Sequence, residues 1–182
     1  KDAQKFRKET MPDGSTKFAF TSVSLALPKD TVLLIACKKN VKLYASTGDQ
    51  VALFAITGFG KTPEELSSAE RKSLQQSFDP IVLAIEKELI ENGDAKKLGE
   101  LFSKSHSLLR EKGVSSKNIE EGIKICLQNG AMGAKLTGGG GNAGAFIALA
   151  WKKDADKIKQ KLAENGFDSF FAEFAKEEPK RE

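Results

Sequence analysis

Residues 130–150 read GAMGAKLTGGGGNAGAFIALA, and this stretch decides the fold. Residues 134–137 predict a short strand, and residues 145–151 (AFIALAW) predict a second, more apolar one. The glycines at 138–141 do not suit a packed strand, because glycine costs backbone entropy and contributes no side chain. The stretch therefore predicts two neighbouring strands that are joined by a glycine-rich loop.

Further strands and a helix flank this stretch. Residues 31–37 (TVLLIAC) form a continuous apolar run with β-branched side chains, which predicts a buried strand. Upstream, residues 17–27 alternate like a strand, whereas residues 1–16 are polar and contain the turn signal PDGS. Downstream, residues 154–165 predict an amphipathic helix closed by glycine, and residues 167–174 predict a final strand.

The middle of the chain predicts several helices. Thr47 begins a capping-box pattern that ends at Gln50, and Thr62 begins a second one with Glu65. Helical spacing continues through residues 78–91 and through two later segments. Those segments are separated by glycine at 93 and 113, and Ser115 or Ser116 caps the last, which runs through Leu127.

The order of these elements gives the fold class. With the helical middle counted as one crossover, the chain reads βαββαβ, which is the ferredoxin-like, split-βαβ plan of an α+β domain. We expect an antiparallel sheet with an extended helical insertion on one face. The chain has 182 residues, which suits one domain with a sizeable core.

Composition excludes several classes of protein. The net charge is +4, and basic residues alternate with acidic ones, as in KELIENGDAKK, so we expect no nucleic-acid partner. No apolar run approaches the length of a membrane helix, and the charged first residues do not resemble a signal peptide. Two cysteines in apolar runs and one histidine favour neither a disulfide scaffold nor a zinc site. We expect an intracellular protein, with the cytoplasm as the first choice of compartment and an organelle as the alternative.

The glycine run carries the strongest chemical signal. Successive glycines allow backbone N–H groups to turn inward and bind an anion such as phosphate. A loose hairpin loop between two strands explains the same residues, and the glycines alone do not decide between these alternatives. The stretch GFGKT at 58–62 imitates a P-loop, but Ala55 occupies the position where that motif requires glycine.

The loop and its surroundings resemble the third motif of the GHMP kinases, in the form typical of mevalonate kinases. The similar residues are Gly130-Ala131, then GAKLTG at 133–138, the further glycines and the IAL strand. DAKKLGEL at 94–101, SHSLL at 105–109 and GVS at 113–115 are similar to the helices that precede this motif in the family. The resemblance covers residues 30–174 and is strongest from 93 to 150.

The resemblance implies a transfer of the γ-phosphoryl group of ATP, with Mg²⁺, to a small-molecule alcohol. In the family an N-terminal domain supplies the ATP loop, the acidic residue and a lysine, and the C-terminal domain closes the cleft. No catalytic residue and no metal ligand is therefore assigned to this chain. The implied phosphate-side residues are Lys135, Thr137, Gly138, Gly139, Gly140 and Gly141, and the candidate substrate-side residues are Ser46, Thr47 and His106.

Each substrate-side residue also has a structural explanation. Ser46 and Thr47 suit a helix cap, and a lone histidine on a leucine stripe is more often a hydrogen-bonded structural residue than a base. The implied substrate is mevalonate, and isoprenoid biosynthesis is the implied pathway. Phosphomevalonate, galactose and homoserine are substrates of kinases with the same architecture.

Two departures from the family pattern leave an alternative open. The glycine run breaks at Asn142-Ala143, and no PxxxGLGSS-like ATP loop occurs in these residues. We therefore expect the chain to need a GHMP kinase N-terminal domain, in the same native chain or as a partner. The alternative is a catalytically inactive, kinase-derived scaffold or interaction subunit, and a stand-alone ferredoxin-like binding domain is a third option.

The sequence also predicts three parts of the chain. Residues 1–29 would be an N-terminal tail with edge strands, 30–175 the GHMP kinase C-terminal domain, and 176–182 a charged tail. The missing initiator methionine suggests either an internal fragment or a trimmed chain.

Overall fold

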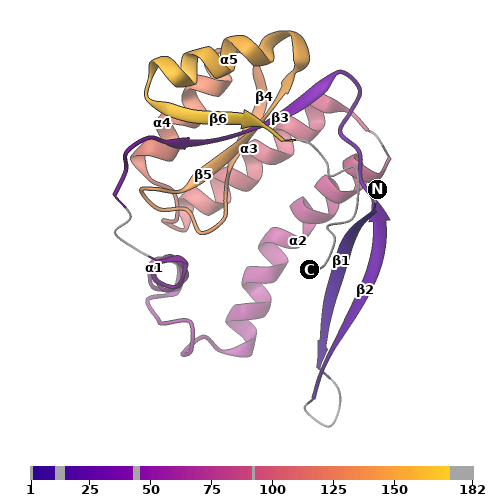
Figure 1. The fold of residues 1–182 in the computed structure, drawn as a ribbon. Coiled ribbons are helices and arrows are strands. Elements are labelled where there is room, and N and C mark those ends of the chain that lie inside the picture. Colours follow the sequence, from indigo (N-terminus) through magenta and orange to yellow (C-terminus); the bar gives the residue numbers. More distant parts are fainter. Residues whose placement is uncertain (1, 11–14, 43–45, 92, 173–182) are drawn as a thin grey trace, which may run out of the picture.

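Six strands and five helices form in the residues that the structure, a computed structural model, describes, namely 2–10, 15–42, 46–91 and 93–172 (Figure 1). In chain order they are β1 (Asp2–Thr10), β2 (Thr16–Ser24), β3 (Thr31–Lys38), α1 (Thr47–Phe59), α2 (Ser68–Ile90), α3 (Ala95–Glu111), α4 (Lys117–Gln128), β4 (Ala131–Thr137), β5 (Ala145–Trp151), α5 (Lys152–Glu164) and β6 (Phe167–Phe171).

The main sheet confirms the predicted fold class. Its four strands lie in the order β4-β5-β3-β6, and each neighbouring pair is antiparallel. The first strand, β3, is central: Ile35 pairs with Ile147 of β5 on one side and with Phe170 of β6 on the other. This order is that of the split-βαβ plan, in which each crossover returns past an intervening antiparallel strand.

The two faces of the sheet are covered by different helices, because side chains alternate along each strand. Leu34 of β3 and Phe146 of β5 face a core cluster that α4 and α5 complete with Ile123 and Ile158. Leu149 instead packs in a second cluster with residues of α3 and α2: Leu98, Phe102, Ile85 and Leu89. The insertion that contains α2 and α3 thus contacts one face, and α4 and α5 fill the other.

Helix α3 approaches β4 closely because glycines meet at the contact. A Cβ atom on Gly133 of β4 would collide with the backbone of Gly99 of α3, and one on Gly99 would lie 2.5 Å from the Met132 carbonyl carbon. Only residues without side chains allow this approach. The first part of the GAMGAKLTG motif therefore serves helix packing.

The N-terminal segment forms a separate hairpin. Strands β1 and β2 pair with each other, from Asp2–Ser24 to Thr10–Thr16, in a two-stranded sheet of their own (Figure 1). The sequence predicted β2 but not β1, because residues 2–10 are rich in charge. Neither strand joins an edge of the main sheet among the described residues. Most of the PDGS turn and the charged tail at 176–182 fall outside the described residues.

Two helices begin elsewhere than predicted. The N-cap of α1 is Ser46, one residue before Thr47, because the Asp49 carboxylate accepts from the Ser46 N–H (2.6 Å) and completes a capping box. The predicted box at Thr62 exists only in part: Glu65 accepts from the Thr62 N–H (2.8 Å), but the chain makes a turn there. Helix α2 starts five residues later, where the Ser67–Glu70 box is complete. Of the two serines predicted to cap the last of these helices, Ser116 is the N-cap of α4.

Candidate functional site

A cavity of about 540 Å³ lies where β4 runs into the glycine loop, and we call it the loop cavity. It is bounded by α1, by the turn that leads into α2, by the α3–α4 connection and by the end of β4. Its lining residues are Gln50, Val51, Phe54, Ala55, Pro63, Leu66, Arg71, Leu74, Leu109, Val114, Lys135, Leu136, Thr137, Gly138 and Gly139. Four of the six predicted phosphate-side residues are among them.

The loop glycines divide into two pairs. Gly138 (φ 68°) and Gly139 line the cavity, and a Cβ atom on Gly138 would meet nothing within 4 Å. Gly140 (φ 73°) instead packs on the Val114 carbonyl, which also accepts a hydrogen bond from the Gly141 N–H (3.0 Å). The first pair is therefore open to a ligand, whereas the second anchors the loop on the α3–α4 connection.

Asn142 fastens the loop at its other end. Its side chain donates to the carbonyl of Lys42 (2.7 Å), and its own carbonyl accepts from the Asn118 side chain of α4 (2.8 Å). These bonds tie the loop to the connection after β3 and to α4. The departure from the family's glycine pattern thus has a structural role at this position.

Lys135 gives the cavity a positive charge. Its ammonium group donates to the Leu136 carbonyl (2.9 Å), and burial lowers the pKa of the side chain from its ordinary value. No described carboxylate forms an ion pair with Lys135, and none of the described lining residues is acidic. The electrostatics of the cavity therefore favour an anion.

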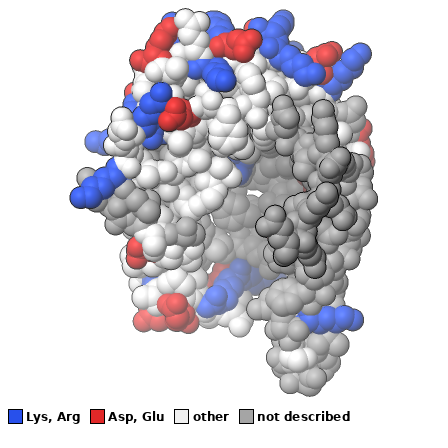
Figure 2. All heavy atoms as spheres, viewed as in Figure 1, with Lys and Arg blue, Asp and Glu red and all other residues white. Residues whose placement is uncertain are grey.

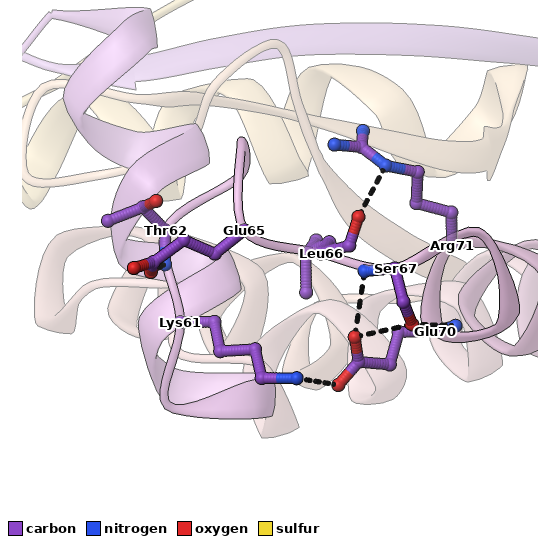
Figure 3. A network of polar contacts seen from close by, with 7 residues as sticks. All are labelled: Lys61, Thr62, Glu65, Leu66, Ser67, Glu70 and Arg71. Atoms are coloured by element: carbon purple, nitrogen blue, oxygen red, sulfur yellow. Dashed lines mark hydrogen bonds and ion pairs between the residues drawn. The ribbon is translucent and has the colours of Figure 1, made fainter.

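Arg71 adds a second cation that the sequence analysis missed. It lies in the first turn of α2, after the Ser67 cap, and lines the cavity. Figure 3 shows its side chain beside Leu66. In the sequence it belongs to the charged segment SAERKS, which resembles an ordinary solvated helix face. No sequence signal distinguishes it, because its place in the cavity depends on where α2 begins.

Ser46 lies at the start of α1 and acts as its cap. Its hydroxyl accepts from the Asp49 N–H (3.2 Å) and donates to the Asp49 carboxylate (2.8 Å). The Ser46 amide and hydroxyl bonds lower the pKa of Asp49 below its ordinary value. Ser46 does not belong to the described lining of the loop cavity, and Thr47 is the first residue of α1.

His106 belongs to a different cavity, of about 280 Å³, between α3 and α4. Its Nδ1 atom accepts from the Leu136 N–H (3.4 Å), so Nε2 carries the proton and donates to Glu120 (2.9 Å). Ser115 donates to the same carboxylate oxygen (2.5 Å). Burial lowers the pKa of His106 and favours this neutral form. The structure therefore does not bring His106 and Ser46 together in the loop cavity.

Surface charge is mixed on the face shown in Figure 2. Lys, Arg, Asp and Glu side chains alternate over the α5 end of this face, without a patch of one sign there. Among the described residues, no group of three or more His, Cys, Asp or Glu side chains could hold a metal ion. A search of the same residues finds no helix with the length and apolarity needed to cross a membrane.

Comparison with known proteins identifies the domain. Residues 86–168, which include α3, α4, β4, the glycine loop and β5, match the family model described as GHMP kinases C terminal. These residues are a GHMP kinase C-terminal domain. The loop cavity is thus built by the third-motif segment of this domain together with α1 and the start of α2.

Mevalonate kinases are among the similar proteins. The mevalonate kinase of Pyrococcus abyssi is 40% identical over 86 residues, which are 47% of this chain and 25% of that protein. That of Aeropyrum pernix is 35% identical over 88 residues, or 48% of this chain and 27% of that protein. This chain therefore spans well under half the length of these relatives.

Solved structures extend the similarity over a larger share of the chain. A structure of L. major mevalonate kinase in complex with R-mevalonate matches with a TM-score of 0.64 and 25% identity, over 88% of this chain and 44% of that one. A Lactococcus lactis galactokinase matches with a TM-score of 0.57 over 85% of this chain and 47% of that one, but at 16% identity it shows only the shared fold.

Proposed function

We propose that this chain is the C-terminal half of an ATP-dependent small-molecule kinase of the mevalonate kinase type. The observation that carries the proposal is the loop cavity: Lys135, Thr137, Gly138 and Gly139 of the third motif line one wall of it. Phosphoryl transfer asks a protein mainly for positioning and for electrostatic stabilisation of the phosphate oxygens. A cation beside open glycine backbone is suited to both tasks.

The described residues fit a phosphate group better than a metal ion. Lys135 and Arg71 line the cavity and none of its described lining residues is acidic, so these residues offer donors to an anion and no carboxylate to Mg²⁺. When bound, Mg·ATP supplies the transferable phosphoryl group and a divalent charge. On this chain Lys135 would bind phosphate oxygens, and Gly138 and Gly139 would admit the phosphate close to the backbone. The Mg²⁺ ligands and the catalytic acid would come from a companion N-terminal domain.

Helix α1 supports the existence of that companion. Val51, Leu53 and Ile56 are 51%, 43% and 51% exposed, although they belong to a largely apolar helix beside the cavity. Apolar side chains clustered on one exposed element commonly mark a contact surface. We propose that the N-terminal half, as part of the same native chain or as a partner, covers α1 and closes the cleft.

Mevalonate is the proposed alcohol substrate, because the sequence relatives above are mevalonate kinases. The cavity wall formed by Val51, Phe54 and Leu74 suits a small branched acid with an apolar methyl group. Phosphomevalonate, galactose and homoserine are the alternative substrates. A phosphotransfer assay with all four alcohols compares their rates.

The test is phosphotransfer by the native protein isolated from its source, with γ-labelled ATP, Mg²⁺ and each alcohol. We expect label in mevalonate, and we expect Lys135→Met to reduce kcat/KM by about 100-fold or more. Lys124→Met is the matched control, because Lys124 is exposed on α4 and lies outside the loop cavity. If no alcohol is labelled while the protein co-purifies with a larger assembly, the scaffold alternative replaces the kinase.

A further inference from the structure

Arg71 occupies an unusual position for an arginine of a charged helix segment. Its Nε atom donates to the Leu66 carbonyl (3.1 Å), and one terminal nitrogen donates to the Pro63 carbonyl. Both carbonyls belong to the turn before α2, so these bonds hold the guanidinium at the rim of the loop cavity. A guanidinium has five N–H donors, and the two used here leave three for another acceptor.

The nearby carboxylates are occupied by other groups. Glu70 binds the Lys61 ammonium (2.6 Å) and the Ser67 N–H (2.8 Å), and Figure 3 shows it turned away from Arg71. Its bonds to Lys61 and Ser67 lower the pKa of Glu70 to about 2, so it remains a charged acceptor for those partners. Glu65 binds the Thr62 N–H (2.8 Å). No ion pair between Arg71 and a carboxylate exists among the described residues.

The walls around this guanidinium strengthen its attraction for an anion. Leu66, Leu74 and Phe54 line the same cavity and reduce its polarity. Arg71 itself is exposed at the rim of the cavity, so the apolar walls exclude water from only one side of an anion bound there. An arginine can hold a carboxylate or a phosphate with two parallel bonds. The ligand class that fits is an organic anion whose charged end meets Arg71 and whose body contacts the apolar wall.

We propose that Arg71 is an anion-binding residue of the loop cavity, which holds the carboxylate of the acceptor alcohol or a phosphate of the nucleotide. The turn that precedes α2 presents this residue, and the Ser67–Glu70 box with the Lys61–Glu70 pair keeps that turn in place. The inference rests on the proposed kinase function for the names of the ligands. The anion site itself depends only on the geometry of the cavity.

The experiment measures equilibrium binding of three probes to the native full-length protein by titration calorimetry: R-mevalonate, a non-hydrolysable ATP analogue and inorganic pyrophosphate. Arg71→Gln retains an amide donor for the turn carbonyls but removes the charge. Lys72→Gln is the matched control, because the adjacent Lys72 is exposed like Arg71 but is not among the described residues that line the cavity. Thermal unfolding of each variant reports any loss of structure.

We expect Arg71→Gln to weaken binding of one probe by about 10- to 100-fold, the range for a lost charge-assisted pair, while Lys72→Gln changes it less than about twofold. Weaker R-mevalonate binding assigns Arg71 to the acceptor carboxylate, and weaker binding of the analogue and pyrophosphate assigns it to a phosphate. Arg71→Lys should lose less affinity, because it keeps the charge without the two-pronged geometry. If Arg71→Gln does not fold, the binding affinity of Arg71→Lys tests whether Arg71 binds the anion.

Two results would overturn the inference. In one, both Arg71 variants bind all three probes as the native protein does. In the other, Lys72→Gln weakens binding as much as Arg71→Gln, which means that net charge alone acts. Failure of the kinase proposal looks different: the native protein transfers no phosphate, yet it binds pyrophosphate, and Arg71→Gln abolishes that binding.

Discussion

The Nδ1 atom of His106 in α3 accepts a hydrogen bond from the backbone N–H of Leu136 in β4 (3.4 Å). Strand β4 lies at the edge of the main sheet, so this side chain satisfies a buried amide that has no neighbouring strand. We expect His106→Leu to lower the free energy of unfolding by about 1–3 kcal/mol, since it leaves the buried Leu136 amide without its acceptor, whereas Glu120 keeps its bond from Ser115. Urea denaturation followed by circular dichroism measures this loss.

A second variant separates the two bonds of His106. His106→Asn places a side-chain oxygen near the position of Nδ1, so it should recover part of the stability lost in His106→Leu. Ser107→Ala is the control, because the adjacent hydroxyl bonds only the Ser103 carbonyl within its own helix (3.1 Å). Equal stability of His106→Leu and the native protein would show that the Leu136 bond contributes nothing.

Acid should destabilise the domain through the same histidine. Burial lowers the pKa of His106 below its ordinary value of about 6.5, although Glu120 opposes this and Arg110 and Lys135 reinforce it. The unfolded chain therefore binds the proton more tightly. The neutral His106 therefore contributes its full stabilisation above about pH 6.5, and this contribution is lost as the pH falls through the pKa of His106 in the folded protein. The free energy of unfolding decreases by no more than about 1.4 kcal/mol per pH unit in this range.

Chemical denaturation from pH 7.5 to 5.0 measures this dependence, with His106→Asn as the reference without an imidazole. The difference in free energy of unfolding between the native protein and His106→Asn should decrease as the pH decreases. A difference that grows on acidification would mean that the charged imidazole is the stabilised form, contrary to its buried geometry.

Glycine at position 133 should be required for packing. Gly133→Ala places a methyl group against the backbone of Gly99, and neither backbone can move without displacing α3 from β4. We expect a loss of about 3 kcal/mol or more, at the upper end of the overpacking range. Gly60→Ala is the control: Gly60 has a positive φ of 66° but nothing within 4 Å of a Cβ atom, so it should cost only about 1 kcal/mol. Equal losses of stability in Gly133→Ala and Gly60→Ala would contradict the close approach of α3 to β4.

Asn142 offers a test of the loop's anchorage. Asn142→Gly would extend the glycine run but remove the bond to the Lys42 carbonyl (2.7 Å). We expect a loss of about 1 kcal/mol in stability and faster amide exchange in residues 138–141. Asn142→Asp keeps the size of the side chain without its N–H donors, and it should behave like the glycine variant. A more stable Asn142→Gly protein would support the loose-hairpin explanation of the loop.

Local patterns predicted most of the fold. The β4–loop–β5 stretch, the central strand β3 and the cap at Ser116 depend on residues within a few positions of one another, which a sequence displays directly. Strand β1 was missed because its residues are polar and its pairing with β2 is the main feature that defines it. The start of α2 was misplaced because two similar capping patterns follow each other within five residues, at Thr62 and Ser67.

The site was less accessible to sequence reasoning. The third-motif residues were found because they adjoin one another, whereas Arg71 and Phe54 reach the same cavity from other elements. His106 shows the opposite situation: its rarity attracted attention, yet its two ring nitrogens bind Leu136 and Glu120 away from the loop cavity. Which distant residues share a cavity depends on helix starts and packing, and no short sequence window contains that information.

The measurement that tests the central claim most directly is amide hydrogen exchange of residues 136–141 in the native protein, with and without Mg²⁺ and a non-hydrolysable ATP analogue. We predict slower exchange at Gly138 and Gly139, which line the cavity, and little change at Gly141, whose amide already donates to the Val114 carbonyl (3.0 Å). Saturating nucleotide that leaves the exchange of Gly138 and Gly139 unchanged would contradict a phosphate-side role for the loop.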